Sequence, residues 1–137
     1  MKLGGVNIKT ILNIIGSSFL TTICYFLGGY DLALQSLIIV IIIDYISGLL
    51  KAIVDKKISS KIGLKGIIKK VGYLLIVTLS VLIDKNFGSN GLVRNAVIYF
   101  FISNEGISIL ENWSGLGLPI PNTIKNALDQ LKDKEVK

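Results

Sequence analysis

The sequence contains no histidine and a single cysteine, Cys24. Histidine is the commonest general base near neutral pH and the commonest ligand of transition metals, so its absence removes a familiar route to catalysis and to metal binding. One cysteine cannot form a disulfide within the chain or supply a pair of metal ligands. We therefore expect no disulfide framework and no metal centre.

Motifs for catalysis and for cofactor binding are missing as well. No glycine-rich phosphate loop and no nucleophile beside a base can be assembled, and the GLGL of residues 115–118 is too short to bind a dinucleotide. Asp44 and Glu105 could be read as the acid pair of a membrane protease, but no substrate-gating feature accompanies them. We expect a protein that is not an enzyme and that has no cofactor.

Charge is also scarce in these 137 residues: charged residues make up 18% and hydrophobic residues 51% of the chain. The mean hydropathy is +0.66, and this balance is typical of a membrane protein. The formal net charge of +6 would suggest nucleic acid in a soluble protein. Here the basic residues lie mainly between the apolar segments, so we expect no nucleic-acid partner.

Four apolar segments approach the length of about 20 residues with which a helix crosses a hydrocarbon core of about 30 Å. They are residues 11–27, 32–50, 71–83 extended at either end, and 92–110. The third is the weakest, because a longer span must include Lys69 and Lys70, whose ammonium groups would reach the headgroups along apolar stems. The predicted fold is all-α with four transmembrane helices, or with three and an interfacial N-terminal helix.

The connections between these segments predict their orientation. Residues 51–70 contain seven lysines against Asp55 alone, the first connection contains no basic residue, and the third contains only Lys85 and Arg94. Basic residues concentrate in cytoplasmic loops. We therefore expect residues 51–70 and both termini to lie in the cytoplasm.

The basic connection is predicted to lie on the membrane surface. Its lysines recur every four residues from Lys57 to Lys69 beside apolar positions at helical spacing, which is typical of an interfacial helix on anionic lipid. Gly63 and Gly66 disfavour a helix, so an ordinary positive loop is the alternative. The predicted surface residues are Lys56, Lys57, Lys61, Lys65, Lys69 and Lys70.

Asp44 lies within SLIIVIIIDYISGLL, the most apolar run of the chain. An acid at the centre of a transmembrane helix costs about 2.5–3.5 kcal/mol on insertion scales, and such residues mark functional sites. Helical spacing places Ser47, Gly48 and Lys51 on the same face. We predict that this polar stripe avoids lipid and faces another helix or water.

The fourth segment has a second polar group, in which Asn104, Ser108 and Glu111 share one face and Glu105 is adjacent. In the predicted topology this group lies at a depth comparable with Asp44, so the two faces can meet. Two interpretations remain open for them. The residues either pack inside a static bundle or line a water-filled path or an oligomer interface.

The composition changes after the fourth segment. Residues 1–114 are predicted to form the transmembrane domain and residues 115–137 a cytoplasmic amphipathic tail, in which Pro119 and Pro121 separate two elements. The tail is expected to end in a short amphipathic helix that packs or docks a partner. Its apolar positions at helical spacing are Ile124, Ala127, Leu128 and Leu131.

Three blocks in a fixed order carry a resemblance to a known family: IDYISGLLKAI, KKISSKIGLKGIIKKV and NEGISILENWSGLGLPIPNTIKNAL. Over residues 28–131 the chain resembles the phage lysis and toxin-secretion holins of low-GC Gram-positive bacteria. The family pattern is an embedded Asp followed by Gly, a Lys-rich loop with Ser-Ser-Lys-x-Gly, and a late acidic block that leads into G-L-P-x-P. The matching positions are Asp44, Gly48, Ser59, Ser60, Gly63, Gly66, Lys69, Glu105, Ser108, Ile109, Leu110, Asn112, Gly117, Leu118, Pro119 and Pro121.

The resemblance implies a small multi-pass protein that accumulates in the bacterial cytoplasmic membrane, oligomerises and opens a lesion at a set time. The lesion releases a cell-wall hydrolase (an endolysin) or a large toxin, so the expected partners are further copies of the chain, anionic lipid and that released protein. Asp44 would line the pore or form the helix contact that delays opening. The alternative is a membrane scaffold or small channel that recruits a partner through the basic loop and the C-terminal helix.

Overall fold

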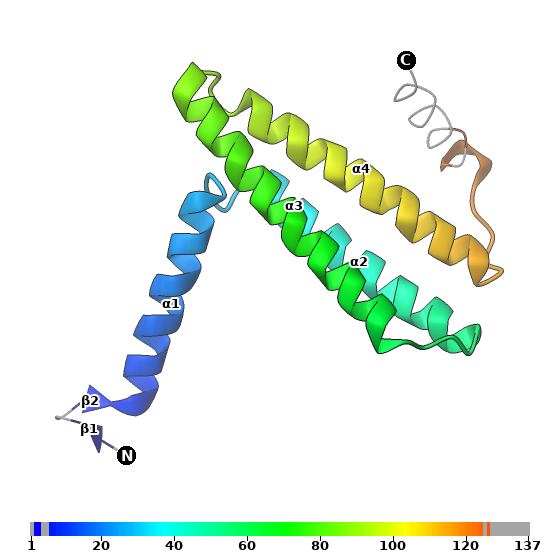
Figure 1. Ribbon diagram of the computed structural model, residues 1–137, viewed down its shortest axis with the longest axis horizontal. Coiled ribbons are helices and arrows are strands. Elements are labelled where there is room, and N and C mark those ends of the chain that lie inside the picture. The colour runs from blue at the N-terminus through cyan, green and yellow to red at the C-terminus, as the bar shows by residue number, and fades with distance from the viewer. Residues whose placement is uncertain (1, 4–5, 125, 127–137) are drawn as a thin grey trace.

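The computed structural model describes residues 2–3, 6–124 and 126. Four helices account for most of them: α1 (Ile8–Phe26), α2 (Leu32–Val54), α3 (Ser60–Phe87) and α4 (Leu92–Gly115). A short antiparallel pair of strands, β1 (Lys2–Leu3) and β2 (Val6–Asn7), precedes α1. Helices α2, α3 and α4 form a bundle and α1 points away from it (Figure 1). The predicted all-α class is confirmed.

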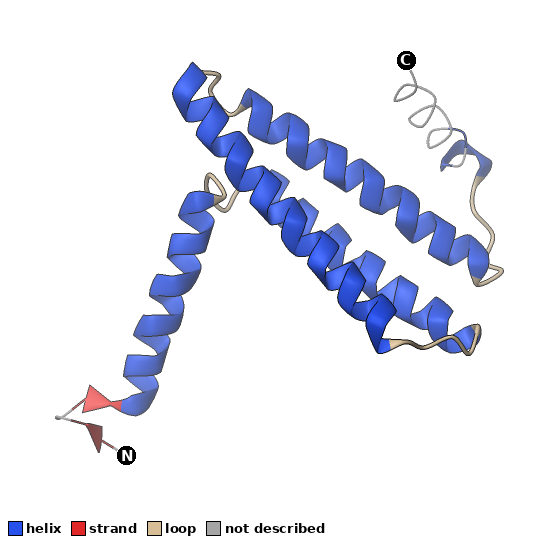
Figure 2. Cartoon of the chain, in the orientation of Figure 1, coloured by secondary structure: helices blue, strands red, loops and turns tan. Residues whose placement is uncertain are grey.

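Short connections set the order and direction of the bundle helices (Figure 2). The carboxylate of Asp31 caps α2 by accepting a hydrogen bond from the N–H of Leu34 at 3.0 Å. Gly88 ends α3 in the left-handed conformation, with φ of +67°, and Gly91 precedes α4 with φ of +82°. Helix α3 therefore runs antiparallel to both neighbours, while α2 and α4 run parallel to each other.

Helix α4 holds the bundle together, because it packs along α2 and against α3, whereas α2 and α3 meet at few places. The rings of Tyr73 and Phe101 stack between α3 and α4 with their centroids 4.1 Å apart. The apolar core lies in the half of the bundle nearer the α3–α4 connection. Its buried members on the bundle helices are Leu34, Leu37, Tyr73, Val77, Ile98 and Phe101.

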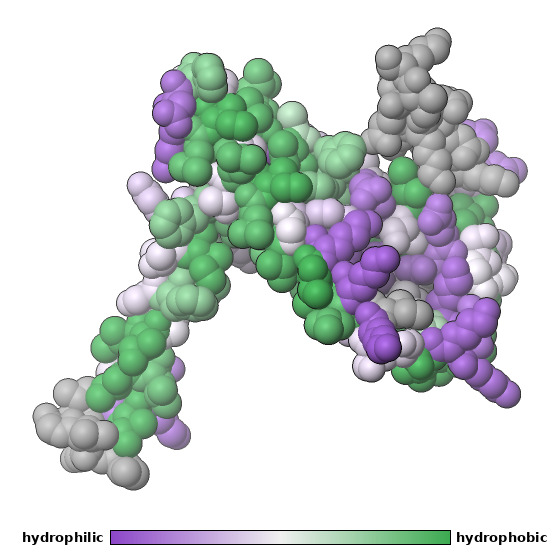
Figure 3. Space-filling model, viewed as in Figure 1, coloured by the Kyte–Doolittle hydropathy of each residue, from purple (hydrophilic) through white to green (hydrophobic). Residues whose placement is uncertain are grey.

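The outer surface is largely apolar. Hydrophobic side chains cover α1 and much of α3, while hydrophilic ones gather over the part of the bundle toward the α2–α3 connection (Figure 3). Large side chains such as Ile39, Leu75 and Phe100 are at least half exposed. A soluble protein rarely leaves so much apolar surface in water, whereas hydrocarbon accommodates it. The surface therefore indicates a membrane protein.

Among the described residues, three helices are long and apolar enough to cross a membrane: Ile8–Phe26, Leu32–Val54 and Gly63–Phe87. The N-terminal helix, which the alternative prediction places in the interface, is one of these. Helix α4 is not, because polar and charged residues such as Arg94 and Glu105 lower its hydropathy. The predicted count of four spans is therefore not confirmed.

The basic connection is much shorter than predicted. Helix α2 continues to Val54 and α3 begins at Ser60, so only residues 55–59 of the predicted loop 51–70 lie between helices. The alternative of an ordinary loop is wrong for residues 60–70, because their lysine spacing belongs to the first turns of α3. The predicted interfacial segment and the predicted third span form one continuous helix.

At the other end of the chain, α4 ends at Gly115 and residues 122–124 are helical. Three apolar positions of the predicted C-terminal helix, Ala127, Leu128 and Leu131, lie outside the described residues. Its amphipathic character therefore stays a prediction.

Candidate functional site

A buried ionic cluster of Asp44, Lys70 and Glu105 joins the three bundle helices. The Lys70 ammonium donates a hydrogen bond to Asp44 Oδ2 at 2.8 Å and another to Glu105 Oε2. The side chains of Asp44, Lys70 and Glu105 are only 14%, 12% and 2% exposed. One interior lysine thus serves two acids, each of which would be costly to bury alone.

Asn112 and Ser47 complete the hydrogen bonding of Asp44. The amide of Asn112 donates to Asp44 Oδ1 at 3.3 Å and to Ser47 Oγ at 3.1 Å, and Ser47 Oγ donates to the carbonyl of Asp44 at 3.0 Å. Both carboxylate oxygens of Asp44 therefore have a partner. In the part of the chain that the structure describes, every buried side-chain nitrogen and oxygen atom has a hydrogen-bond partner.

The polar stripe predicted on α2 lies against α4. Ser47 is buried, and a Cβ at Gly48 would lie 3.4 Å from the amide nitrogen of Asn112. The side chain of Lys51 passes over Gly115, where a Cβ would lie 2.5 Å from Lys51 Cε. The stripe therefore faces a helix, which is one of the two environments that its spacing predicts.

The buried face of α4 is rotated from the predicted one. Its buried residues recur every three or four positions and are Arg94, Ile98, Phe101 and Glu105. The same spacing continues to Asn112, which reaches Asp44. Glu105, expected only beside the polar face, is therefore at its centre, and the face runs through Glu105 and Asn112.

The three residues predicted to share the polar face of α4 have different surroundings. The amide of Asn104 donates a hydrogen bond to the hydroxyl of Tyr73 at 3.1 Å. Ser108 is half-buried and Glu111 is exposed. Of the four predicted α4 residues, Glu105 is the one that the observed ion pairs place in the ionic cluster.

The six lysines predicted at the membrane surface do not share one environment. The prediction is wrong for Lys70, because its side chain points into the bundle. Lys70 lies three and seven positions before the buried residues Tyr73 and Val77, but Lys69 also lies at helical spacing from Tyr73, so spacing alone does not separate the two lysines. Lys69 is exposed, with its ammonium 5.6 Å from the centroid of the Tyr73 ring. The exposed members that precede it are Lys56, Lys57, Lys61 and Lys65.

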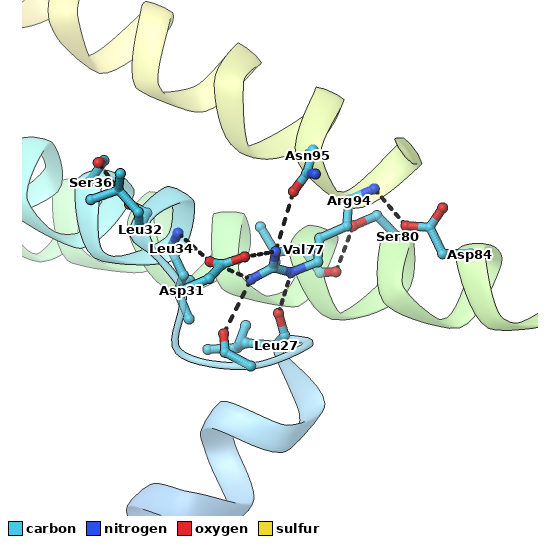
Figure 4. A network of polar contacts seen from close by, with 11 residues as sticks. Leu27, Asp31, Leu32, Leu34, Ser36, Val77, Ser80, Asp84, Arg94 and Asn95 are labelled. Carbon is cyan, nitrogen blue, oxygen red and sulfur yellow. Dashed lines mark hydrogen bonds and ion pairs between the residues drawn. The ribbon is translucent and has the colours of Figure 1, made fainter. Parts of the chain in front are cut away.

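A second polar cluster, the Arg94 clasp, joins the α1–α2 turn to α4 (Figure 4). The guanidinium of Arg94 donates to both carboxylate oxygens of Asp31, at 2.7 and 3.1 Å. It also donates to the carbonyls of Leu27 at 2.6 Å and Gly29 at 3.2 Å. These hydrogen bonds from Arg94 hold the pKa of Asp31 below its usual range, against the opposing effect of burial.

Gly28 and Asp84 make the clasp possible. Gly28 has φ of +83°, and a Cβ there would lie 2.7 Å from Arg94 Nε and 2.9 Å from Val81 Cγ2. The carboxylate of Asp84 accepts hydrogen bonds from the N–H groups of Val93 at 3.0 Å and Arg94 at 2.8 Å, so it caps the first turn of α4. The sequence pattern presents Asp84 and Arg94 only as charges of the third connection and does not predict the clasp.

The two clusters differ in what they can do. The Arg94 clasp lies at the end of the bundle and ties backbone carbonyls, so it anchors the fold. The ionic cluster lies near the middle of α2 and α4, where its groups meet only because three helices are closed around them. No group of three or more His, Cys, Asp or Glu side chains among the described residues is placed to hold a metal ion.

Comparison with known proteins gives one family. The bacteriophage holin family matches residues 21–133, which include all three bundle helices and both clusters. An uncharacterized 14.9 kDa protein of Clostridium perfringens is 41% identical over 117 residues, which are 84% of this chain and 88% of the relative. An uncharacterized protein of Listeria monocytogenes is 42% identical over 104 residues, covering 76% of this chain and 74% of the relative. No solved structure matches.

The clasp generates a first prediction. Arg94→Lys keeps the charge but cannot reproduce the planar fork that binds Asp31 and the two carbonyls, so we expect a loss of about 2 kcal/mol in unfolding free energy. The measurement is unfolding in mixed micelles with increasing denaturing detergent, followed by circular dichroism. Lys85→Arg, an exposed basic exchange near the same end, should leave the transition unchanged. If both variants unfold at the same detergent concentration, the clasp does not stabilise the fold.

The ionic cluster generates a second prediction. Lys70→Met leaves Asp44 and Glu105 buried without a cation, and we expect a loss of about 3–5 kcal/mol in the same assay. Lys69→Met, at the adjacent exposed position, is the matched control and should cost far less. Adding Asp44→Leu and Glu105→Leu to Lys70→Met should recover much of the loss, because no unpaired charge then remains. A similar loss for Lys69→Met and Lys70→Met would contradict the pairing.

Proposed function

Because the chain belongs to the bacteriophage holin family, we propose that it is a holin that oligomerises in the bacterial cytoplasmic membrane and opens a timed lesion there. The lesion releases a cell-wall hydrolase, or in a toxin locus a large toxin, and the protein itself catalyses nothing. One observation carries the proposal beyond family membership. The ionic cluster keeps charged side chains inside a bundle whose exterior is apolar.

The cluster suits a protein with two arrangements in the membrane. Its charged and polar groups satisfy one another across α2, α3 and α4, so the closed chain presents mainly apolar side chains to lipid. In an oligomer, the same helix faces can turn toward a common lumen, where water replaces the internal hydrogen bonds. Neither arrangement places an unpaired charge in hydrocarbon, which would be strongly disfavoured.

The packing of the bundle supports opening between α2 and α3. These two helices contact each other at few places and are held together mainly by α4. Among the described residues, the bond of Lys70 to Asp44 is the side-chain hydrogen bond that joins them directly. Loss of this one link would loosen α3 from α2 while α4 stays bound to α2.

We propose that α4 crosses the membrane beside α2, which gives four spans. It runs parallel to α2 and contacts it near both ends, through Arg94 with Asp31 and through Asn112 with Ser47. Two of its three charged residues, Arg94 and Glu105, are buried and so do not meet lipid. The third, Glu111, is exposed and lies in the last turns of the helix. With the lysines around the α2–α3 connection on the cytoplasmic side, both termini are cytoplasmic.

The third prediction tests lesion formation. Expression of the full chain in bacteria should stop growth and collapse the membrane potential. It should cause lysis when a cell-wall hydrolase is co-expressed in the cytoplasm, because the lesion passes proteins. A potential-sensitive dye, turbidity and release of a cytoplasmic reporter enzyme measure these effects, with the hydrolase alone as control. Unchanged permeability would contradict the proposal, and ion flow without protein release would indicate a small selective channel instead.

The fourth prediction concerns timing. Asp44→Asn can keep a hydrogen bond with Asn112 but loses the ion pair with Lys70, so the closed state should be destabilised by about 1–3 kcal/mol and lysis should begin earlier. The measurement is the delay from induction to loss of potential at equal protein level. Asp55→Asn removes an exposed acid just past the end of α2 and should leave the delay unchanged.

The role of Asp44 can also be separated from simple packing. If Asp44→Asn and Asp44→Leu both leave the delay and the size of the oligomer as in the unmodified chain, Asp44 only packs between helices and has no part in opening.

A further inference from the structure

Two cavities lie between α2 and α3 and share Tyr45 and Lys70 in their linings. The first has a volume of about 300 Å³ and a mixed lining, whose polar members include Lys57, Ser59 and Asn112. The second has a volume of about 380 Å³ and an almost wholly apolar lining. Its characteristic residues are Ile38, Ile41, Ile42, Ile46, Ile67 and Leu74. The space between the two helices thus changes from a partly polar end, which we name the polar half, to an apolar one along its length.

The two cavities form one groove, which we name the α2–α3 groove. On α2 its lining runs from Ile38 through Tyr45 to Ala52 at helical spacing. At about 1.5 Å of rise per residue this path is about 21 Å long. One leaflet of a hydrocarbon core of about 30 Å is about 15 Å thick. The groove therefore has the length of one leaflet together with part of its headgroup layer.

Glycines leave space in the polar half of the groove. Gly66 has no atom within 4 Å of the position of a Cβ, and at Gly63 the nearest atom is the Tyr45 hydroxyl oxygen at 3.8 Å. Both glycines are unfavourable in the interior of a helix, yet both lie in α3 and line this cavity. The cavity exists because these two positions carry no side chain.

The charge offered at the polar end is positive. Lys57 and Ser59 belong to the α2–α3 connection and line the cavity, and Ser59 makes no side-chain hydrogen bond to the first turn of α3. Asp44 also lines this cavity, but its oxygens are bonded to Lys70 and Asn112. An incoming group at the end of the bundle therefore meets an uncommitted ammonium and hydroxyl before it meets a carboxylate.

We propose that the α2–α3 groove binds one anionic phospholipid, with its phosphate at Lys57 and Ser59 and an acyl chain along the isoleucines toward Leu74. A phospholipid matches both halves of the lining in the observed order, whereas an apolar helix of a second copy matches only the apolar half. The chain of the lipid also fills the space where α2 and α3 lack mutual contacts. The proposal rests on the membrane location in the proposed function and not on lesion formation.

The test is native mass spectrometry of the full chain, purified in detergent and titrated with phosphatidylglycerol or with phosphatidylcholine of the same acyl chains. We expect the unmodified chain to retain one phosphatidylglycerol in preference to phosphatidylcholine. Equal retention of both lipids would overturn the proposal. The assay has no permeability readout, so a chain that binds the lipid but forms no lesion refutes the proposed function alone.

Two matched pairs of variants locate the site. Gly66→Phe places a ring in the polar cavity and should abolish the preference for phosphatidylglycerol, whereas Gly72→Phe, on the same helix but lining neither cavity, should retain it. Lys57→Gln should weaken phosphatidylglycerol binding about fivefold, and Lys56→Gln, the neighbouring exposed lysine outside the lining, should have little effect.

Each contrary result identifies a different occupant. Equal weakening by Lys56→Gln and Lys57→Gln would show diffuse attraction of lipid to a basic surface and would overturn the site. A Gly66→Phe variant that keeps its lipid but loses its oligomeric state would show that a second copy enters the groove. If Gly66→Phe does not give a folded helical protein by circular dichroism, the lysine pair decides, because neither lysine is buried.

Discussion

The bond of one lysine to two carboxylates inside an apolar bundle is the constraint on which the rest of the structure depends. Asp44, Lys70 and Glu105 come from three different helices, and none of them is tolerable alone at that depth. Their pairing requires α2, α3 and α4 to lie side by side in one register. The polar partners Asn112 and Ser47, and the close contact at Gly48, follow from that register.

The same constraint is compatible with the proposed function, in which the protein would wait in a membrane before it acts. The apolar exterior makes insertion favourable, while the polar groups that a water-filled lesion needs are already present and neutralise one another. The Arg94 clasp keeps one end of the bundle closed, so the sparse contact between α2 and α3 is the weaker part. A lipid in the groove between them would stabilise the closed arrangement by occupying that space.

Periodicity and charge predicted a large part of this arrangement. The spacing of Asp44, Ser47, Gly48 and Lys51 indicated one stripe, which the structure places against α4, because side chains three and four apart share a helix face whatever the helix packs against. The prediction failed for Lys70, which was treated as one more member of a basic series. A row of lysines gives the same sequence pattern whether all of them face headgroups or one of them faces two buried acids.

The sequence by itself determined the helices, the apolar exterior and the presence of charges that must be hidden, because these follow from local propensity and from the cost of charge in hydrocarbon. Only the tertiary structure decided which groups hide one another. Lys70 reaches partners 26 and 35 positions away along the chain, and a one-residue rotation of α4 places Glu105, and not Asn104, against it. Such pairings depend on how helix faces pack against each other, which no local pattern in one helix specifies.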